Sequence, residues 1–159
     1  MGKKGLTLIE LMVGILVIAL IATIGMVAMK NARAKSRDAK RVYDIQQYAK
    51  AFVMYAQEND GKFPSSSGYL GCNGEIDNQI REYLPDLPVD PSDPKRQCNG
   101  DYYYYYVGQN DCSGIGNIVP TLHIRKMETN NPDYHQNPCV AGSEVGGAKN
   151  AEYLIVVGF

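Results

Sequence analysis

The feature that most constrains this chain is a run of nineteen uncharged residues, 11–29, with the sequence LMVGILVIALIATIGMVAM. Residues 6–10 extend it to twenty-four residues whose one charge is Glu10. About 20 apolar residues in a helix cross the hydrocarbon core of a bilayer, whereas the apolar core of a cleaved secretory signal has roughly 7–15. The sequence therefore predicts a membrane-spanning helical segment at residues 6–29.

Charge is distributed unevenly along the chain. The 159 residues hold 16 Lys+Arg and 17 Asp+Glu, a net charge of -1, which excludes a strongly basic nucleic-acid-binding domain. Residues 1–5 contain two lysines and no acid, whereas residues 42–159 contain eight bases and fifteen acids. Between them, residues 30–41 carry one acid, Asp38, and six bases, which we call the basic collar: Lys30, Arg33, Lys35, Arg37, Lys40 and Arg41.

Glu10 is the exceptional residue of the apolar segment. A carboxylate inside such a segment costs at least ~2.5 kcal/mol unless a cation neutralises it. Two interpretations follow. In the first, Glu10 lies at the headgroup level near Lys3 and Lys4; in the second, it pairs with a positive group of another copy of the chain.

The N-terminus, MGKKG at residues 1–5 followed by LTLIELMV at 6–13, resembles that of type IV prepilins. The resemblance implies that a prepilin peptidase cleaves between Gly5 and Leu6 and that the new N-terminus is methylated. It also implies that Glu10, the fifth mature residue, meets the N-terminal amine of a neighbouring subunit during filament assembly. Cleavage would create that cation, because it converts the Leu6 amide nitrogen into an ammonium group.

The resemblance is close over residues 1 to about 64 and architectural beyond them. Two positions depart from it: Leu6 stands where the family most often has phenylalanine, and Val27 where many pilins have a proline. The implied partners are other pilins in a homo-oligomeric helical filament, the prepilin peptidase, the inner-membrane assembly platform and the membrane itself, with no specific nucleic acid. Residues 1–5 are then a leader, residues 6–29 the membrane and filament-core half of a helix, and residues 30–159 the extracytoplasmic head.

Orientation in the membrane is the point on which two predictions conflict. The positive-inside rule compares two bases in the leader with six in the basic collar and would place the head in the cytoplasm. The resemblance places the N-terminus there instead, and four cysteines in the head favour an oxidising exterior. We expect a single-pass precursor in the inner membrane with its N-terminus in the cytoplasm, and a cell-surface pilus after assembly.

One helix is predicted from about residue 6 to 59, where Asn59-Asp60-Gly61 and then Pro64 end it. Its second half, 30–59, has an apolar stripe at spacings of three and four that should pack on a sheet: Val42, Ile45, Ala49, Phe52 and Ala56. The basic collar should lie just outside the bilayer, where anionic headgroups attract each base by about 1 kcal/mol. Alternatively, the basic collar could pair with acidic heads of neighbouring subunits, or it could bind DNA during uptake.

The head should contain a small sheet. Strands are predicted at residues 102–107, 118–127 and 153–157, with a hairpin at 108–116 and a short helix at 75–84. The five consecutive tyrosines 102–106 should form a strand in which alternate rings pack on the helix and the others point outward. The alternative interpretation is an exposed ladder of rings for adhesion or charge transport. The predicted fold is therefore α+β, the pilin fold, with a long N-terminal helix packed on a three-stranded antiparallel sheet.

Four cysteines, an even number without a C-x-x-C pair, predict two disulfides rather than a zinc site: Cys72, Cys98, Cys112 and Cys139. Pairing Cys72 with Cys98 and Cys112 with Cys139 is favoured because each closes a loop of moderate length, contributing ~3 kcal/mol. Cys98 with Cys139 is the alternative.

Residues with catalytic or metal-binding chemistry do not form a recognisable set. His123 and His135 have no spacing typical of a metal pair or a general base. The segment GSEVGGAK, 142–149, lacks the Ser/Thr of a phosphate loop. Calcium could be bound by Asp90 and Asp93, or by Asn130, Asn131 and Asp133, although turn residues satisfying their own backbone fit these positions better. No metal and no cofactor are therefore predicted.

The sequence predicts a structural subunit of a type IV pilus, not an enzyme. The nearest alternative is a type II secretion pseudopilin, which shares the N-terminal motif. The alternative from a different class is a membrane-tethered carbohydrate- or DNA-binding module that does not polymerise.

Overall fold

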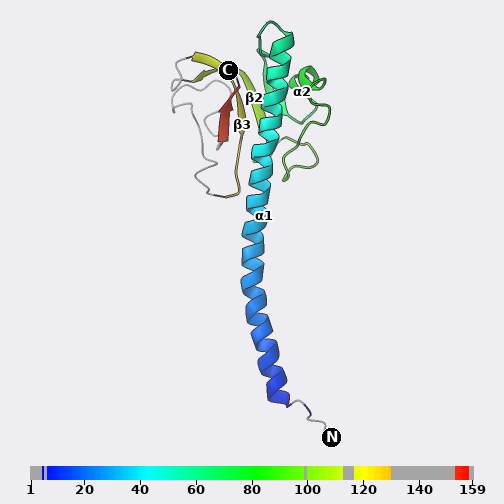
Figure 1. The fold of residues 1–159 in the computed structure, drawn as a ribbon, viewed down its shortest axis with the longest axis vertical. Helices are drawn as coiled ribbons and strands as arrows, with labels where there is room; N and C mark the ends of the chain where they lie inside the picture. The colour runs from blue at the N-terminus through cyan, green and yellow to red at the C-terminus, as the bar shows by residue number, and fades with distance from the viewer. Residues whose placement is uncertain (1–4, 6, 99, 113–116, 130–152, 158–159) are drawn as a thin grey trace.

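The computed structural model describes residues 5, 7–98, 100–112, 117–129 and 153–157. One helix, α1 (Leu8–Glu58, 51 residues), sets the length of the molecule, roughly 75 Å at ~1.5 Å per residue. Figure 1 shows the other elements gathered around the C-terminal half of α1, while its N-terminal half stands clear of them. The predicted single helix is confirmed.

The C-terminal end of α1 follows from the residues Asn59, Asp60 and Gly61. Gly61 has a left-handed φ of +76°, and its N–H donates to the carbonyl of Ala56 at 2.8 Å. A glycine in this conformation satisfies the last carbonyls of a helix without the steric cost of a Cβ. The predicted helix stop is therefore the observed one.

Four strands form one antiparallel sheet in the order β1-β2-β3-β4: β1 (Ser67–Leu70), β2 (Tyr104–Cys112), β3 (Asn117–Ile124) and β4 (Tyr153–Val156). The last three are the predicted strands, so the predicted α+β layout with an antiparallel meander is confirmed. The additional strand β1 pairs with β2 at the sheet edge. Its sequence, SGYL, has neither the length nor the β-branched residues that indicate a strand.

Strand β2 is longer than its sequence suggests. The predicted hairpin at 108–116 is wrong in its first part: β2 continues to Cys112, with a register shift between Val107 and Asn110. Gly108 is needed for a different reason. A Cβ at this position would collide with the backbone of Pro64 and Ser65, which crosses close to β2.

The core lies between the second half of α1 and the sheet. The predicted alternation of tyrosines is confirmed: Tyr104 and Tyr106 are fully buried, and Tyr106 stacks on Phe52 with ring centroids 4.1 Å apart. Burying one large apolar side chain contributes roughly 1.5–3 kcal/mol. All five residues of the predicted stripe on α1 belong to this core or pack against it, and the fully buried Tyr48 joins them.

The connection between β1 and β2 carries a disulfide between Cys72 and Cys98. It also contains α2 (Glu75–Ile80), which is shorter than the predicted 75–84 because the N–H groups of Tyr83 and Leu84 both donate to the carbonyl of Ile80 in a tight turn. The buried carboxylate of Asp77 accepts the N–H of Gly71 at 2.9 Å. This connection is thus tied down by covalent and polar contacts.

Gly71 should be one of the least replaceable residues of the head. It has a left-handed φ of +75°, and a Cβ there would collide with the carbonyl oxygen of Pro88 and approach Val89 Cγ1 to 3.1 Å. We expect Gly71→Ala to lower the free energy of unfolding by about 2 kcal/mol or more. The measurement is urea unfolding of the full chain in detergent, followed by tyrosine near-UV circular dichroism. The control is Gly100→Ala, where the added Cβ meets open space. This variant should change the free energy of unfolding little.

Candidate functional site

The exposed end of α1 begins with a reciprocal hydrogen-bond motif between Thr7 and Glu10. The Thr7 N–H and hydroxyl donate to Glu10 Oε2 at 2.9 and 2.6 Å, and the Glu10 N–H donates to Thr7 Oγ1 at 3.4 Å. Threonine followed three residues later by glutamate is a capping box, which satisfies two N–H groups that the first helical turn leaves free. The acid also lies at the positive end of the helix dipole.

Glu10 keeps capacity for one more partner. Both Thr7 hydrogen bonds end on Oε2, while Oε1 has no partner among the residues that the structure describes. The surrounding side chains are apolar and exposed: Leu8 is 78%, Leu11 58% and Val13 57% accessible. A single carboxylate oxygen able to accept a cation is therefore held on an otherwise apolar surface.

The apolar half of α1 has no packing partner among the residues that the structure describes. Its eighteen-residue window of highest hydropathy, mean 2.8, is 0% buried, and by length and composition it could cross a membrane. Such a surface is not stable in water over this length, because apolar area is favoured only when it leaves water. Lipid or other helices must cover it.

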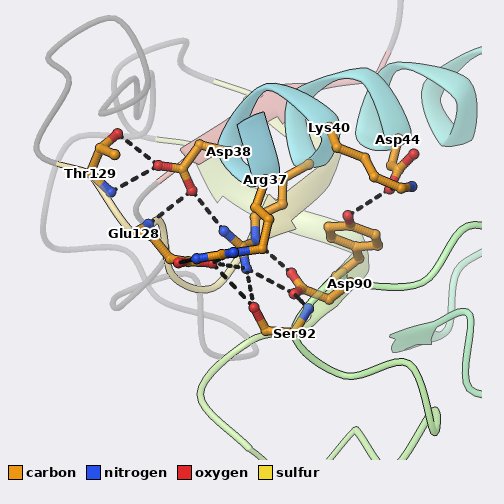
Figure 2. Close-up of polar contacts among 10 residues, drawn as sticks. Arg37, Asp38, Lys40, Asp44, Asp90, Ser92, Glu128 and Thr129 are labelled. Atoms are coloured by element: carbon orange, nitrogen blue, oxygen red, sulfur yellow. Dashed lines mark hydrogen bonds and ion pairs between the residues drawn. The ribbon is translucent and has the colours of Figure 1, made fainter. Parts of the chain in front are cut away.

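A second polar site lies where α1 enters the head. We call it the Arg41 cluster, and it comprises Arg37, Asp38, Arg41, Asp90, Ser92, Glu128 and Thr129. Figure 2 shows Asp38 on α1, Asp90 and Ser92 on one loop, and Glu128 and Thr129 on another segment converging at this point. The Arg41 side chain at the centre is completely buried.

The Arg41 guanidinium is satisfied on all sides. It donates from Nη1 to Asp38 at 2.7 Å, from Nε and Nη2 to the two carboxylate oxygens of Asp90 at 2.7 and 2.9 Å, and from Nη2 to Glu128 at 3.0 Å. Burial alone would lower the pKa of Arg41, but the hydrogen bonds and charge of Asp90, with those of Glu128 and Asp38, raise it above its ordinary value. The residue is therefore charged, and its face packs 4.6 Å from the ring centroid of Tyr102.

Asp38 and Glu128 connect α1 to the segment that follows β3. Glu128 forms a two-pronged ion pair with Arg37, one contact being 2.6 Å from Nε to Oε1. Asp38 accepts the N–H groups of Glu128 and Thr129 at 2.9 and 2.8 Å and the Thr129 hydroxyl at 2.7 Å. The cluster thus joins three segments that are far apart in the sequence.

The predicted location of the basic collar requires a correction. Arg37 and Arg41 belong to the Arg41 cluster, and Lys40 donates to Asp44 at 2.6 Å, so these three bases bind acids of their own chain rather than headgroups. The sequence did not indicate this, because Asp90 and Glu128 lie 49 and 87 residues from Arg41. Lys30, Arg33 and Lys35 remain exposed, as predicted for a surface beside the bilayer.

The other predicted site residues have different outcomes. Cys72 pairs with Cys98, whereas Cys139 is outside the described residues, so its pairing with Cys112 stays a prediction. Asp90 is bound to Arg41, and Asp93 accepts the N–H groups of Gln97 and Cys98, so neither carboxylate is turned toward an ion. Outside the described residues are Leu6, the asparagine set Asn130, Asn131 and Asp133, His135, and the segment 142–149.

His123 is buried on β3 and contacts Thr121, with Nε2 and Oγ1 2.7 Å apart. Burial lowers the pKa of His123 to about 4, so it is neutral at physiological pH. Within the part of the chain that the structure describes, no group of three His, Cys, Asp or Glu residues is placed to hold a metal ion.

Replacing Arg41 tests whether the cluster fixes the head on the helix. We expect Arg41→Met to lower the free energy of unfolding by about 3–5 kcal/mol, because Asp38 and Asp90 would remain buried without their cation. Arg33→Met, which removes an exposed arginine from the same helix, should change it by less than about 0.5 kcal/mol. Chemical unfolding of both full-length variants in detergent measures this, and equal effects would contradict the assigned role.

Glu128 should make the stability of the head sensitive to acid. The hydrogen bond from Arg37, aided by Arg41, lowers the pKa of Glu128 from 4.5 to about 2. A depressed folded-state pKa contributes stability that is complete above pH 4.5 and is lost as the pH falls through 2. The unfolding free energy of the wild type minus that of Glu128→Gln should therefore shrink between pH 4.5 and 2. A difference independent of pH across this window would show that the charge of Glu128 is not what stabilises the head.

Comparisons with known proteins agree with the N-terminal geometry. A family model, the prokaryotic N-terminal methylation motif, matches residues 1–26, which include Glu10 and its capping box. Neither a search of curated proteins nor one of solved structures finds a match. The match thus covers residues 1–5 and most of the apolar half of α1, and the head has no counterpart in these comparisons. The chain carries at its N-terminus the methylation motif that is the hallmark of type IV pilin and pseudopilin precursors.

Proposed function

We propose that the chain is a structural subunit of a type IV pilus, cleaved after Gly5 and polymerised through the apolar half of α1. The observation that carries the proposal is a long, fully exposed apolar helix surface that begins at a processing motif and holds one acid, Glu10. A membrane can cover that surface in the precursor, and neighbouring helices can cover it in a filament. The proposed partners are therefore the prepilin peptidase, the assembly platform and further copies of the chain or other pilins.

The role of Glu10 in this proposal is to set the register between subunits. Cleavage between Gly5 and Leu6 leaves an ammonium group at Leu6, and Oε1 of Glu10 on an adjacent subunit can accept it. A carboxylate left unpaired among apolar helices costs at least ~2.5 kcal/mol, so a shifted register is penalised. Helix packing supplies the attraction, and the ion pair selects one arrangement.

The proposed orientation rests on the disulfide rather than on the count of bases. Of the six collar bases, Arg41 is buried in the head and Arg37 is paired with Glu128, so the exposed bases beside the membrane segment are Lys30, Arg33, Lys35 and Lys40, against two lysines in the leader. The disulfide between Cys72 and Cys98 favours an oxidising compartment for the head. The disulfide supports a precursor with its N-terminus in the cytoplasm, whereas the base count, which is still larger on the head side, opposes it.

The Arg41 cluster suits a subunit that is pulled out of a membrane by its helix. Arg41 lies twelve positions after Met29, the last residue of the apolar segment, and it links α1 to the two loops that bear Asp90 and Glu128. A network that costs about 3–5 kcal/mol to break keeps the head in one orientation on the helix. Filament packing needs this, because the head of each subunit must meet its neighbours in the same way.

A type II secretion pseudopilin remains the second candidate, because the matched motif is common to both kinds of precursor. A calcium-binding loop in the head would favour it. The Asp90 carboxylate is instead occupied by Arg41, and Asp93 by backbone N–H groups, so this pair gives the pseudopilin no support. The other predicted calcium set, Asn130, Asn131 and Asp133, lies outside the described residues.

Substitutions of Glu10 separate its charge from its role in starting the helix. Glu10→Val should leave membrane insertion of the precursor intact but abolish filaments, because it removes the proposed partner of the Leu6 ammonium group. Glu10→Gln should do the same, although glutamine can complete a capping box. The measurements are the amount of sheared filaments and of precursor in cell membranes, with mass spectrometry of the N-terminus as a check on cleavage. Normal filament yield from Glu10→Gln would show that capping matters and charge pairing does not.

A further inference from the structure

The outer face of the sheet, opposite α1, carries three neighbouring tyrosines that the proposed assembly mechanism does not use. Tyr69 on β1 lies opposite Tyr105 on β2 in the strand register, and Tyr103 directly precedes β2. The ring centroid of Tyr69 lies 4.9 Å from that of Tyr103 and 5.1 Å from that of Tyr105, and the interplanar angles are 80° and 83°. The rings therefore form a corner of aromatic faces and edges, with Tyr69 43% exposed.

The hydroxyl groups of these tyrosines differ from those in the core. On the inner side, Tyr48 donates to the carbonyl of Pro88, Tyr104 to Asp44 and Tyr106 to the carbonyl of Pro64, at 2.6, 2.9 and 2.7 Å. In the described part of the chain, the hydroxyls of Tyr69, Tyr103 and Tyr105 have no such partner. These outer hydroxyls are free to bond a ligand.

Arg125 adds a positive charge to the same place. It follows β3, its N–H donates to the carbonyl of Tyr103 at 3.1 Å, and its guanidinium lies close enough to oppose the rise in the pKa of Tyr103 that burial causes. Unlike Arg37 and Arg41, it has no carboxylate or hydrogen-bond acceptor for its side chain among the described residues. The nearby acid, Asp101, is bound to Lys126 at 3.0 Å.

We infer that this surface, the outer tyrosine patch (Tyr69, Tyr103, Tyr105 and Arg125), binds a saccharide that carries one carboxylated sugar. The C–H face of a pyranose ring packs on aromatic rings, tyrosine hydroxyls bond its hydroxyl groups, and a guanidinium binds a carboxylate with two parallel hydrogen bonds. Charge complementarity selects the acidic sugar, because the half-buried Arg125 side chain has neither a counter-ion nor a hydrogen-bond acceptor among the described residues.

The charge of the head limits the ligand further. Residues 42–159 hold fifteen acids and eight bases, so a chain of many negative charges, such as a nucleic acid, would be repelled around the patch. A mostly neutral glycan with an isolated uronic acid avoids this repulsion and still satisfies Arg125. No residue of the patch lies on α1, and Tyr69 is 43% exposed while Tyr103, Tyr105 and Arg125 are half-buried. The inference therefore does not depend on the proposed polymerisation.

Two disaccharides that differ by one carboxylate test the inference. Cellobiouronic acid, glucuronic acid linked to glucose, should bind the full-length chain in a detergent without a sugar headgroup, and cellobiose should bind at least tenfold more weakly. Saturation-transfer NMR and titration calorimetry measure both. Absence of cellobiouronic acid binding at millimolar concentration, or equal affinity for the two disaccharides, would overturn the inference.

Matched variants locate the binding site. Arg125→Gln should remove the preference for cellobiouronic acid, and Tyr69→Ala should weaken both disaccharides, while the folded state is checked by near-UV circular dichroism. Tyr43→Ala, which removes a tyrosine that is 62% exposed on α1, should change neither affinity. If Tyr69→Ala instead alters self-association and leaves binding unchanged, the patch is a contact between copies and the inference is wrong.

Discussion

The buried guanidinium of Arg41 is the constraint around which the head is arranged. A charge removed from water must be surrounded by opposite charges and hydrogen-bond acceptors, and only Asp38 among its carboxylate partners comes from α1 itself. Asp90 and Glu128 must therefore be brought to the helix by the connection before β2 and by the segment after β3. Because both segments flank the sheet, the same contact fixes the sheet against the apolar stripe of α1.

A single helix serves two environments, and its sequence changes where the environment changes. Between Leu11 and Met29 the large side chains whose burial the structure describes are apolar and exposed, which fits a surface covered by lipid or by other helices. Beyond Arg37 the helix is amphipathic, with one face in the core of the head and the other in water. Between them lie Lys30, Arg33 and Lys35, the exposed bases suited to the membrane boundary.

The polar sites at the N-terminus of α1 and at its entry into the head differ in one respect. In the Arg41 cluster every charge has its counter-ion within the chain, so the cluster stabilises the monomer. At the N-terminus, Glu10 uses one oxygen to start the helix and offers the other, so the monomer is left incomplete there. This difference between a closed and an open ionic site is what connects the structure of the subunit to its proposed assembly.

Local patterns along the sequence predicted the apolar segment, one helix from about residue 6 to 59 that the structure shows as 8–58, the alternation of Tyr104, Tyr105 and Tyr106, and the N-terminal methylation motif. Each depends on residues a few positions apart, so periodicity and hydropathy suffice to find it. Only the tertiary structure decided that Arg37, Lys40 and Arg41 bind acids of their own chain and that SGYL forms strand β1. It also decided that Arg125 and Tyr69 both lie next to Tyr103. Those contacts join residues up to 91 positions apart, and their existence depends on the path of the folded chain rather than on any local preference.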